Sequence, residues 1–426
     1  MGTYYIWTVG CQMNVADAER LGAEFAAQGH TVVQSPDDAD IVVVNSCVVR
    51  QQAEDRAVNK LSALRAGKMR KPQQTIALMG CMVGPRTEDL ERRFPHVDMF
   101  MRPQQFAPLL DLTSALPLGD GCLPAGLSLE ATGPTAFVNI VHGCDNFCTF
   151  CIVPYRRGRE RSRPVCEIVA EIEGLVAQGV RDVTLLGQKV DSYGHDLGDM
   201  DLAGLLHAVH AVEGVDRIRF LTSYPLGVTD KLIDTVASLP KVCEHINIPV
   251  QSGDDEQLTL MHRGYTLAQF RDRMRVIKQR LPGGSLATDV IVGFCGETEQ
   301  QFQHTLDLME EVRFDVVHVA MYSERPGTIA ARTMADDVPA EVKRERLHRV
   351  EDLQERIATE LNQPLLGQHL EVLAEHHKDG RWEGRTRTNK VVHFTAPSLA
   401  LQGQLATVRI TSTSPWSLQG ELVSVG

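Results

Sequence analysis

Short apolar runs followed by helical stretches recur along most of the chain, and this alternation restricts the possible folds more than any other feature. Within the first 115 residues the unit occurs three times. Strands that alternate with helices pair in parallel, because each helix returns the chain to the same edge of the sheet. The apolar runs are Tyr4 to Val9, Ile41 to Val44 and Thr75 to Met79, and the helical stretches are Val15 to Gln28, Gln51 to Ala66 and Thr87 to Phe94.

A cysteine follows each of these three apolar runs at the equivalent place. Cys11, Cys47 and Cys81 each come after a small or polar residue at the predicted end of a strand. Ligands bind parallel sheets at the carboxyl ends of the strands, so the three thiols should converge there. Cysteines that serve only in packing would more often lie inside the strands. The pattern therefore favours a three-cysteine ligand set.

Six further apolar runs alternate with helical stretches between residue 135 and about residue 325. Six such units predict a parallel barrel, or an open partial barrel, with its site at the carboxyl ends of the strands. A long amphipathic helix follows, in which Val350, Leu353, Ile357 and Leu361 recur at helical spacing. The runs are Phe137 to Val141, Asp182 to Gly187, Arg217 to Thr222, His245 to Val250, Ala287 to Phe294 and Val316 to Tyr322.

The last part of the chain, residues 363–426, changes to short alternating strands. Five of them in so short a segment predict a small OB-like barrel, an architecture that often binds oligonucleotides. Residues 116–134 are rich in proline and glycine and indicate a linker. The five strands are Leu370 to Leu373, Arg381 to Thr386, Val391 to Phe394, Leu405 to Ile410 and Leu418 to Val423.

The most specific motif lies directly after the first strand of the predicted barrel. Cys144, Cys148 and Cys151 are spaced as C-x3-C-x2-C. Three thiolates in one tight loop suit a 4Fe-4S cluster, and they leave its fourth iron open. An open iron can bind the amino and carboxylate groups of S-adenosylmethionine, a known source of radical chemistry at such clusters. The alternative is a structural zinc site, which normally takes four ligands from paired, separated elements.

With this motif the chain resembles the radical S-adenosylmethionine superfamily, and with Cys11, Cys47 and Cys81 it resembles the methylthiotransferases within it. The resemblance covers the whole chain. The chain departs from the family at Ala18, where serine is frequent, and at Cys295, where proline is usual. The resemblance rests on Gly10 to Asn14, Asn45 to Arg50, Gly80 to Met82, Phe147 to Pro164, Leu186 to Gly194, Pro249 to Gly253, Arg263 to Thr266 and Gly384 to Lys390. The segment Gly384 to Lys390 resembles part of a TRAM domain, which binds RNA.

The resemblance implies an α/β fold in three parts. These are an N-terminal parallel-sheet domain of Rossmann or flavodoxin-like type (1–115), a central partial (β/α)6 radical barrel (135–362) after the linker (116–134), and a C-terminal OB-like TRAM barrel (363–426). It also implies two 4Fe-4S clusters. One binds S-adenosylmethionine at Cys144, Cys148 and Cys151, and the auxiliary cluster is held by Cys11, Cys47 and Cys81.

Within the family, the Gly187 to Gly194 stretch and the tail are most similar to members that act on tRNA. The implied reaction is methylthiolation of carbon 2 of N(6)-dimethylallyladenosine beside the anticodon, with S-adenosylmethionine as radical source and methyl donor. A low-potential electron donor such as flavodoxin or ferredoxin is implied as well. The alternatives are a threonylcarbamoyl-adenosine tRNA or a ribosomal-protein aspartate as substrate, and a non-catalytic iron–sulfur protein that binds RNA or transfers electrons.

Further polar residues are candidates for binding. Those at strand ends of the barrel could contact S-adenosylmethionine or substrate, although such residues are as often loop caps. Arginines after the cluster loop and basic residues in the tail, beside Trp382 and Phe394, suit RNA, although they could be a solvated charge run or, for Trp382, barrel core. The first group is Gln188, Ser223, Gln251 and Arg263, and the second is Arg156, Arg157, Arg159, Lys378, Arg381, Arg385, Arg387 and Lys390.

Composition bears on the partner and the compartment. The net charge is -12, but the acidic excess lies in the middle of the chain, and screening lets local basic patches bind phosphates. Ten cysteines are too few for a disulfide scaffold in 426 residues.

No uncharged apolar run approaches the roughly 18 residues of a membrane span, and Met1 to Asn14 lacks a signal-peptide pattern. We expect a cytoplasmic monomer that does not contact membranes, with Cys122, Cys166, Cys243 and Cys295 as packing or surface thiols.

Overall fold

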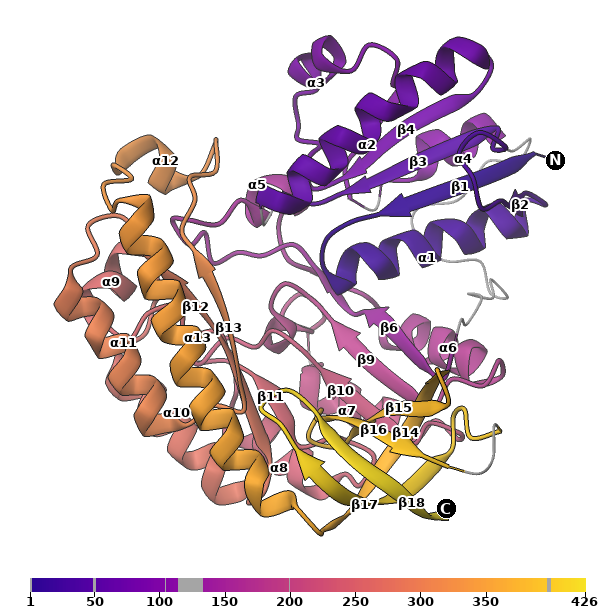
Figure 1. Cartoon of the computed structure of the whole chain (residues 1–426). Helices are drawn as coiled ribbons and strands as arrows, with labels where there is room; N and C mark the ends of the chain where they lie inside the picture. The colour runs from indigo at the N-terminus through magenta and orange to yellow at the C-terminus, as the bar shows by residue number, and fades with distance from the viewer. Residues whose placement is uncertain (1, 49–50, 104, 114–132, 199, 397–399) are drawn as a thin grey trace.

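The computed structural model describes residues 2–48, 51–103, 105–113, 133–198, 200–396 and 400–426. An N-terminal sheet, a central open barrel and a small closed barrel follow one another along the chain (Figure 1). Most of the predicted linker, residues 116–132, lies outside the described residues, as do Cys122 and the last two residues of the Asn45 to Arg50 motif.

The N-terminal sheet has five parallel strands in the order β2-β1-β3-β4-β5. The central strand β3 is buried at every position, because α1 and α4 cover one face of the sheet and α2 covers the other. The three predicted strands are confirmed, whereas the short edge strands β2 and β5 were not predicted. The elements are β1 (Thr3–Thr8), α1 (Gln12–Ala27), β2 (Thr31–Val32), β3 (Ile41–Ser46), α2 (Gln51–Arg70), β4 (Thr75–Gly80), α3 (Glu88–Arg93), β5 (Met99–Met101) and α4 (Ala107–Thr113).

The central barrel has six parallel strands, as predicted. They form two three-stranded sheets, β10-β9-β6 and β11-β12-β13, joined where Ile218 bridges Val242. Among the described residues β6 and β13 do not pair, so the barrel is open. The strands are β6 (Thr135–Asn139), β9 (Asp182–Leu186), β10 (Arg217–Phe220), β11 (His245–Asn247), β12 (Ser285–Val292) and β13 (Val316–Met321).

Helices cover the outside of this barrel. The predicted long helix is α13, and its Val350 and Ile357 are fully buried against the barrel. Thr266 and Thr298 close capping boxes at the starts of α10 and α11, which fixes where these helices begin. The elements are β7 (Val141–His142), α5 (Val153–Arg157), β8 (Arg161–Ser162), α6 (Val165–Val176), η1 (Val190–Ser192), α7 (Leu202–His210), α8 (Asp230–Ser238), α9 (Asp255–Leu260), α10 (Leu267–Arg280), α11 (Glu299–Val312), α12 (Ile329–Thr333) and α13 (Ala340–Asn362).

The C-terminal strands close into a barrel in the order β14-β15-β16-β18-β17, which confirms the predicted OB-like architecture. Trp382 is only 2% exposed and packs with Phe394 in the core of this barrel. These two aromatic side chains are therefore core residues and do not form an exposed stacking surface for RNA. The elements are η2 (Gln363–Leu365), β14 (His369–Lys378), β15 (Arg381–Thr386), β16 (Val391–Thr395), β17 (Leu405–Thr413) and β18 (Leu418–Val425).

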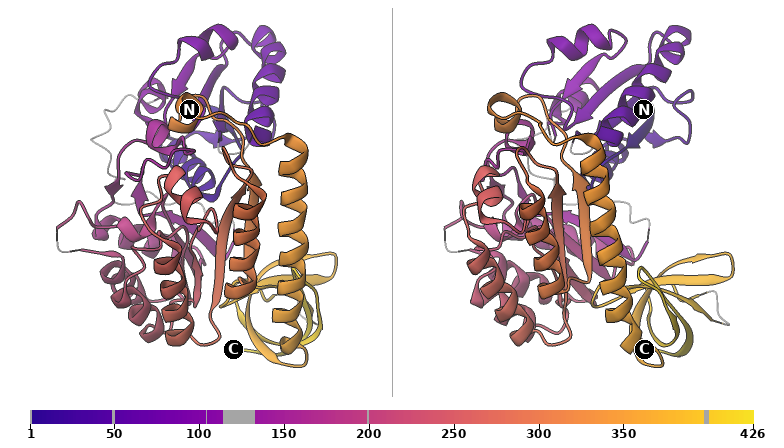
Figure 2. Two further views of the ribbon diagram at one scale, coloured as in Figure 1. Left: turned by 90° about the vertical axis from the view of Figure 1, so that its left-hand side faces the viewer. Right: turned by 60° about the vertical axis from the view of Figure 1, so that its left-hand side comes forward.

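The N-terminal sheet and the small barrel lie at opposite ends of the central barrel (Figures 1 and 2). Helix α1 lies against the carboxyl ends of the barrel strands: the side-chain amide of Asn139, at the end of β6, donates to the carboxylate of Asp17 at 3.1 Å. The turn between β15 and β16 lies against the amino ends, where Ser285 of β12 donates to the carbonyl of Thr388 at 2.9 Å. The carboxyl ends of the barrel strands are thus left facing the N-terminal domain.

Candidate functional site

Cys11, Cys47 and Cys81 come together at one edge of the N-terminal sheet, as the repeated unit predicts. Cys11 directly precedes α1, and Cys47 directly follows β3. A Cβ atom on Gly10 would lie 2.6 Å from the Cβ of Cys47, and Gly10 has a φ of 133°. Only glycine fits so close an approach with that backbone conformation. The amide of Cys81 donates to the carbonyl of Ser46 at 2.9 Å, which ties the third cysteine to the same edge.

Asn14 holds these strand ends in place. Its side-chain amide donates to the carbonyls of Val9, at 3.0 Å, and Ser46, at 2.9 Å. Its Oδ1 accepts from the thiol of Cys11 at 3.7 Å. Burial raises the pKa of the Cys81 thiol, and the neighbouring guanidinium of Arg157 opposes that rise. Asn14 is thus a positioning residue, and its place in the Gly10 to Asn14 motif was the sequence signal for it.

Cys144, Cys148 and Cys151 lie on the loop that leads from β7 into α5. The amide of Cys144 donates to the carbonyl of Gly158 at 3.1 Å, and the amide of Cys151 donates to that of Cys148 at 3.0 Å. Burial, together with the neighbouring Cys148 thiol, raises the pKa of Cys144 to about 11 and that of Cys151 to about 12. Metal ligation needs thiolates, so binding at this loop would release protons.

The donor chemistry of both sets fits an iron–sulfur cluster. Each set offers three sulfur atoms. No group of three His, Cys, Asp or Glu side chains in the described part of the chain surrounds a single ion. That is compatible with a 4Fe-4S cluster, because its four irons each take their own ligand and the thiolates surround a cube rather than a point. Three cysteines leave one iron of each cube for another ligand.

Arg263 is the strand-end candidate that reaches a cysteine set. Its Nη1 lies 3.4 Å from the sulfur of Cys148, and its Nη2 donates to the carbonyl of Pro249 at 2.7 Å. The guanidinium lies over the ring of Tyr224, 4.8 Å from its centre. Tyr224 was not singled out from the sequence, although it directly follows the predicted residue Ser223. A fixed cation beside the cysteine loop suits a carboxylate group of a bound cofactor.

The other three strand-end candidates lie in different surroundings. Ser223 is buried, and its hydroxyl has no hydrogen-bond partner among the described residues. The side-chain amide of Gln188 contacts the sulfur of Met13 on α1, which places Gln188 between the two domains. Gln251 has a φ of 75°, and its backbone amide donates to the carbonyl of Asp289 at 2.9 Å. None of these contacts contradicts a binding role, and the unpartnered Ser223 hydroxyl is the clearest sign of one.

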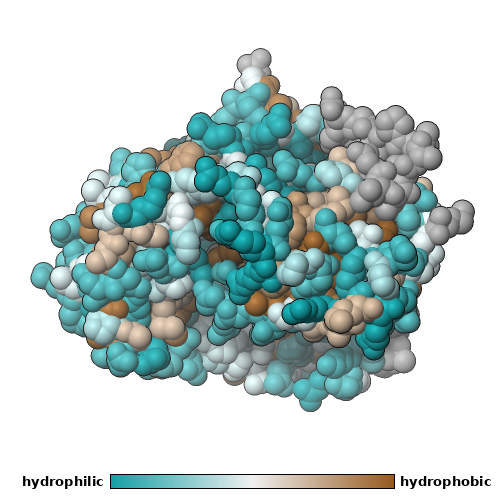
Figure 3. Space-filling view, turned by 90° about the horizontal axis from the view of Figure 1, so that it is seen from above, coloured by the Kyte–Doolittle hydropathy of each residue, from teal (hydrophilic) through white to brown (hydrophobic). Residues whose placement is uncertain are grey.

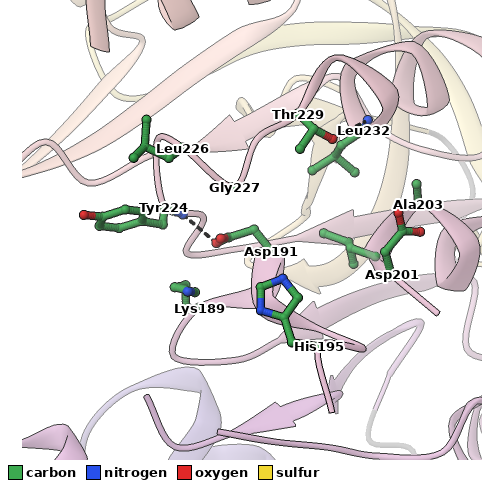
Figure 4. Close-up of a pocket in the computed structure, with 11 residues that line it drawn as sticks. Lys189, Asp191, His195, Asp201, Ala203, Tyr224, Leu226, Gly227, Thr229 and Leu232 are labelled. Carbon is green, nitrogen blue, oxygen red and sulfur yellow. Dashed lines mark hydrogen bonds between the residues drawn. The ribbon is translucent and has the colours of Figure 1, made fainter. Parts of the chain in front are cut away.

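A cavity of about 400 Å3 opens beside the ring of Tyr224 (Figure 4). Asp191 points into it and accepts from the backbone amide of Tyr224 at 2.6 Å. Burial raises the pKa of Asp191 to about 6. Lys189 lines the same cavity, and its Nζ lies 3.5 Å from Glu160. Both residues belong to the Leu186 to Gly194 motif, so this part of the motif shapes a cavity next to the Arg263 cation.

The predicted RNA-binding residues divide into two groups. The Arg159 side chain is 73% exposed and pairs with Asp145 at 2.7 Å, and Lys378 and Arg381 are exposed. Arg156 and Arg385 are partly buried. These five stay candidates for RNA.

Three other predicted RNA-binding residues have side chains that form ion pairs within the protein. Arg157 is buried in an ion pair with Asp17. Arg387 donates to Glu244 at 2.6 Å and to the carbonyl of Val242, and Lys390 pairs with Asp315 at 2.8 Å. Arg387 and Lys390 therefore anchor the small barrel to the central barrel. A basic residue in a sequence does not reveal which acidic group will bury it.

The remaining cysteines that the structure describes agree with their predicted packing or surface roles: Cys243 and Cys295 are buried, Cys295 in an apolar cluster, and Cys166 is exposed. Seen from above, the described face is mainly hydrophilic with scattered apolar areas (Figure 3). No helix among the described residues is both long enough and apolar enough to cross a membrane.

Three family models match successive parts of the chain. The model described as "Uncharacterized protein family UPF0004" matches residues 3–102, the Radical SAM superfamily matches residues 138–309, and the TRAM domain matches residues 365–423. These segments coincide with the N-terminal sheet, the central barrel and the small closed barrel.

Three relatives that match almost the whole chain carry the name tRNA-2-methylthio-N(6)-dimethylallyladenosine synthase. The protein of this name from Dehalococcoides mccartyi (strain CBDB1) is 47% identical over 100% of this chain and 99% of the relative. The one from Chloroflexus aurantiacus is 47% identical over 98% of this chain and 91% of the relative. The one from Moorella thermoacetica is 42% identical over 99% of this chain and 98% of the relative.

Solved structures share the fold at low identity. The radical S-adenosylmethionine methyltransferase TsrM from Kitasatospora setae, with cobalamin and a 4Fe-4S cluster bound, superposes with a TM-score of 0.57 at 14% identity, covering 77% of each chain. The cobalamin-dependent S-adenosylmethionine radical enzyme OxsB gives a TM-score of 0.53 at 12% identity, covering 83% of this chain and 56% of that chain.

Proposed function

The chain belongs to the tRNA-2-methylthio-N(6)-dimethylallyladenosine synthases, the MiaB branch of the methylthiotransferases, and we propose how its own residues divide the work of that reaction. The enzyme adds a methylthio group to carbon 2 of N(6)-dimethylallyladenosine at position 37 of tRNA. It uses 4Fe-4S clusters and S-adenosylmethionine. This family assignment excludes the alternative of a non-catalytic iron–sulfur protein.

We assign one cluster to each three-cysteine set. Cys144, Cys148 and Cys151 hold the cluster that binds S-adenosylmethionine, and Cys11, Cys47 and Cys81 hold the auxiliary cluster. When bound, these groups supply a 5′-deoxyadenosyl radical and a site at which sulfur is presented. The observation that carries the assignment is that the two sets lie on facing edges of adjoining domains. Arg157 links these edges, because it ends the helix after the second set and its guanidinium is bonded to Asp17 and Asn14 on α1, the helix that follows Cys11.

The chain's own polar groups orient the cofactor and substrate. Arg263 offers a partly buried positive charge beside Cys148 for a carboxylate of S-adenosylmethionine. Ser223, Gln251 and Gln188 line the strand ends around it as further contacts to S-adenosylmethionine or substrate. The target base must leave its stack to enter between the two domains, which costs less in an anticodon loop than in a duplex.

The exposed basic residues Arg159, Lys378 and Arg381 bind phosphates of the tRNA, with Arg156 and Arg385 as partly buried contributors. The domain limits are 1–115, 135–362 and 363–426. Reduction of the cluster calls for a low-potential donor of the flavodoxin or ferredoxin type. Each cysteine set is completed within one chain, which supports a monomer, and a tRNA substrate supports action in the cytoplasm.

The test is product analysis after anaerobic reconstitution with iron and sulfide. Wild type, Cys144→Ala, Cys47→Ala and the control Cys166→Ala are incubated with reductant, S-adenosylmethionine and an anticodon stem-loop, prenylated or unmodified. Digested nucleosides are analysed by mass spectrometry. We expect a methylthio adduct only on prenylated adenosine, lost in the first two variants and kept in the control. Product from Cys47→Ala would refute the auxiliary ligand assignment, and an adduct on unmodified adenosine would refute the substrate assignment.

A further inference from the structure

Arg157 reaches from the radical-cluster loop into the N-terminal domain. It is the last residue of α5, which begins two residues after Cys151. Its Nη1 lies 3.0 Å from Asp17, and both side chains are only 2% exposed. Its Nη2 donates to Oδ1 of Asn14 at 2.9 Å. Asp17 and Asn14 both lie on α1, which directly follows Cys11, so this guanidinium is bonded to the helix beside the first cysteine set.

The same guanidinium also lies near two of the cysteines. Its positive charge interacts electrostatically with the thiols of Cys81 and Cys11. The acceptor atom of Asn14 that it binds is also the acceptor for the Cys11 thiol. On the other side, the carbonyl of the next residue, Gly158, accepts from the amide of Cys144. Two adjacent residues therefore connect the first cysteine set to the second.

Stability alone does not account for this arrangement. A buried ion pair is often no more stabilising than apolar side chains of similar volume, because both charges lose their hydration. The planar guanidinium holds its donors in a fixed fork, which makes it suited to fixing the geometry of several acceptors at once. A positive charge placed against thiolates also stabilises negative charge at that site, which is the charge a cluster gains on reduction.

We propose that Arg157 is a positioning residue that fixes the auxiliary cluster relative to the radical cluster and raises the reduction potential of the auxiliary cluster. This inference rests on the proposed function, because it needs a cluster on Cys11, Cys47 and Cys81. Loss of the positive charge lowers the potential of that cluster. Loss of the planar guanidinium donors loosens the contact between the two cysteine-bearing regions, so that S-adenosylmethionine is cleaved without transfer of a methylthio group to the RNA.

The experiment separates charge from geometry with two substitutions. Arg157→Gln removes both the charge and the fork, whereas Arg157→Lys keeps the charge as a single ammonium and loses the fork. Arg86→Gln is the control, because it removes an exposed arginine five residues beyond Cys81. The reduction potential of the auxiliary cluster is measured by redox titration followed by electron paramagnetic resonance. For this measurement each Arg substitution is placed in a full chain that also carries Cys144→Ala, Cys148→Ala and Cys151→Ala, so that only the auxiliary cluster is present. Coupling is measured without those three substitutions, as 5′-deoxyadenosine formed per methylthiolated nucleoside.

We expect Arg157→Gln to shift the reduction equilibrium of the auxiliary cluster at least tenfold toward the oxidised form, about 59 mV for one electron. It should also raise the coupling ratio at least fivefold. Arg157→Lys should raise the ratio and leave the potential near wild type, so this variant carries the test if the glutamine variant does not fold. A potential and a ratio in both variants equal to those of Arg86→Gln would overturn the proposal.

The outcome also distinguishes this proposal from the proposed function. A wild-type protein that makes no methylthiolated nucleoside would refute the function, yet the shift in potential would still decide the role of the Arg157 charge. If the chain in which Cys144, Cys148 and Cys151 are replaced binds no iron, the auxiliary site is refuted, and so is the inference about Arg157.

Discussion

Replacing Arg219 should weaken the junction between the small C-terminal barrel and the central barrel, to which Arg387 and Lys390 also contribute. Arg219 lies in β10, and its Nε donates to the carboxylate of Asp182 at 2.8 Å, with both side chains almost fully buried. Its other nitrogens donate to the carbonyls of Thr386 and Arg387, each at 2.9 Å, on the turn that joins β15 to β16. One side chain thus neutralises a buried carboxylate and holds two carbonyls of the small barrel.

The magnitude follows from what Arg219→Met leaves behind. Removing one partner of a buried ion pair costs about 3–5 kcal/mol, because the other charge stays buried and unpaired. Each buried carbonyl that loses its donor adds about 1–3 kcal/mol, less where water enters. We expect a loss of about 5 kcal/mol in the stability of this junction, and a lower unfolding temperature. Arg409→Gln is the control, because its pair with Glu421 is about half exposed on both sides and is worth about 0–1 kcal/mol.

Differential scanning calorimetry and the rate of proteolysis between α13 and β14 measure this effect. Arg219→Met should unfold at a lower temperature and be cut faster than Arg409→Gln. Adding Asp182→Asn should recover part of the loss, because it removes the unpaired charge that the first substitution creates. The reasoning is refuted if Arg219→Met is as stable as the control, or if the double variant is no more stable than the single one.

Four other substitutions test separate parts of the account. Gly10→Ala should lose only the auxiliary cluster, because the added Cβ would lie 2.6 Å from the Cβ of Cys47, and Gly143→Ala should lose only the radical cluster, because its Cβ would lie 2.1 Å from the carbonyl oxygen of Arg159. Each variant should keep about four irons per chain. Equal iron in both variants and in the wild type would contradict this prediction. Arg263→Gln should raise the S-adenosylmethionine concentration needed for half-maximal 5′-deoxyadenosine formation by about tenfold, the loss of one charge-assisted hydrogen bond, and an unchanged value would remove Arg263 from the cofactor site. The pKa of Asp191 is raised to about 6 by burial, so the folded protein takes up this proton at a higher pH than the unfolded chain and becomes more stable as pH falls from about 6 to about 4. Asp191→Asn should remove this contribution to the pH dependence of stability. Thermal unfolding of both proteins is measured across this pH range, and a difference in unfolding temperature that does not change with pH would contradict the prediction.

The elements and the cysteine sets were predictable because they rest on local patterns. Strands β1, β3 and β4 appear as apolar runs, and a cysteine after each run marks the carboxyl end of a strand. The parallel arrangement then brings the thiols together without further information. By contrast, β2 has only two residues, both exposed, and gives no pattern from which it could be predicted.

The roles of the arginines were not predictable, because they depend on which distant acid each one meets. Arg157 and Arg159 lie two residues apart in the same basic stretch, yet one is buried against Asp17 and the other is exposed. Arg387 looked like an RNA-binding residue in a basic tail, but Glu244 from the central barrel pairs with it. Sequence spacing places such side chains on an element and says nothing of the domain packed against it.

The central claim is that each set of three cysteines holds its own 4Fe-4S cluster. Iron analysis and Mössbauer spectroscopy of the anaerobically reconstituted chain test it most directly, in wild type and in two variants. One variant carries Cys11→Ala, Cys47→Ala and Cys81→Ala, and the other carries Cys144→Ala, Cys148→Ala and Cys151→Ala. The account predicts about eight irons in the wild type and about four in each variant. A variant that keeps all the iron, or one that loses all of it while still folded, would contradict two independent cluster sites.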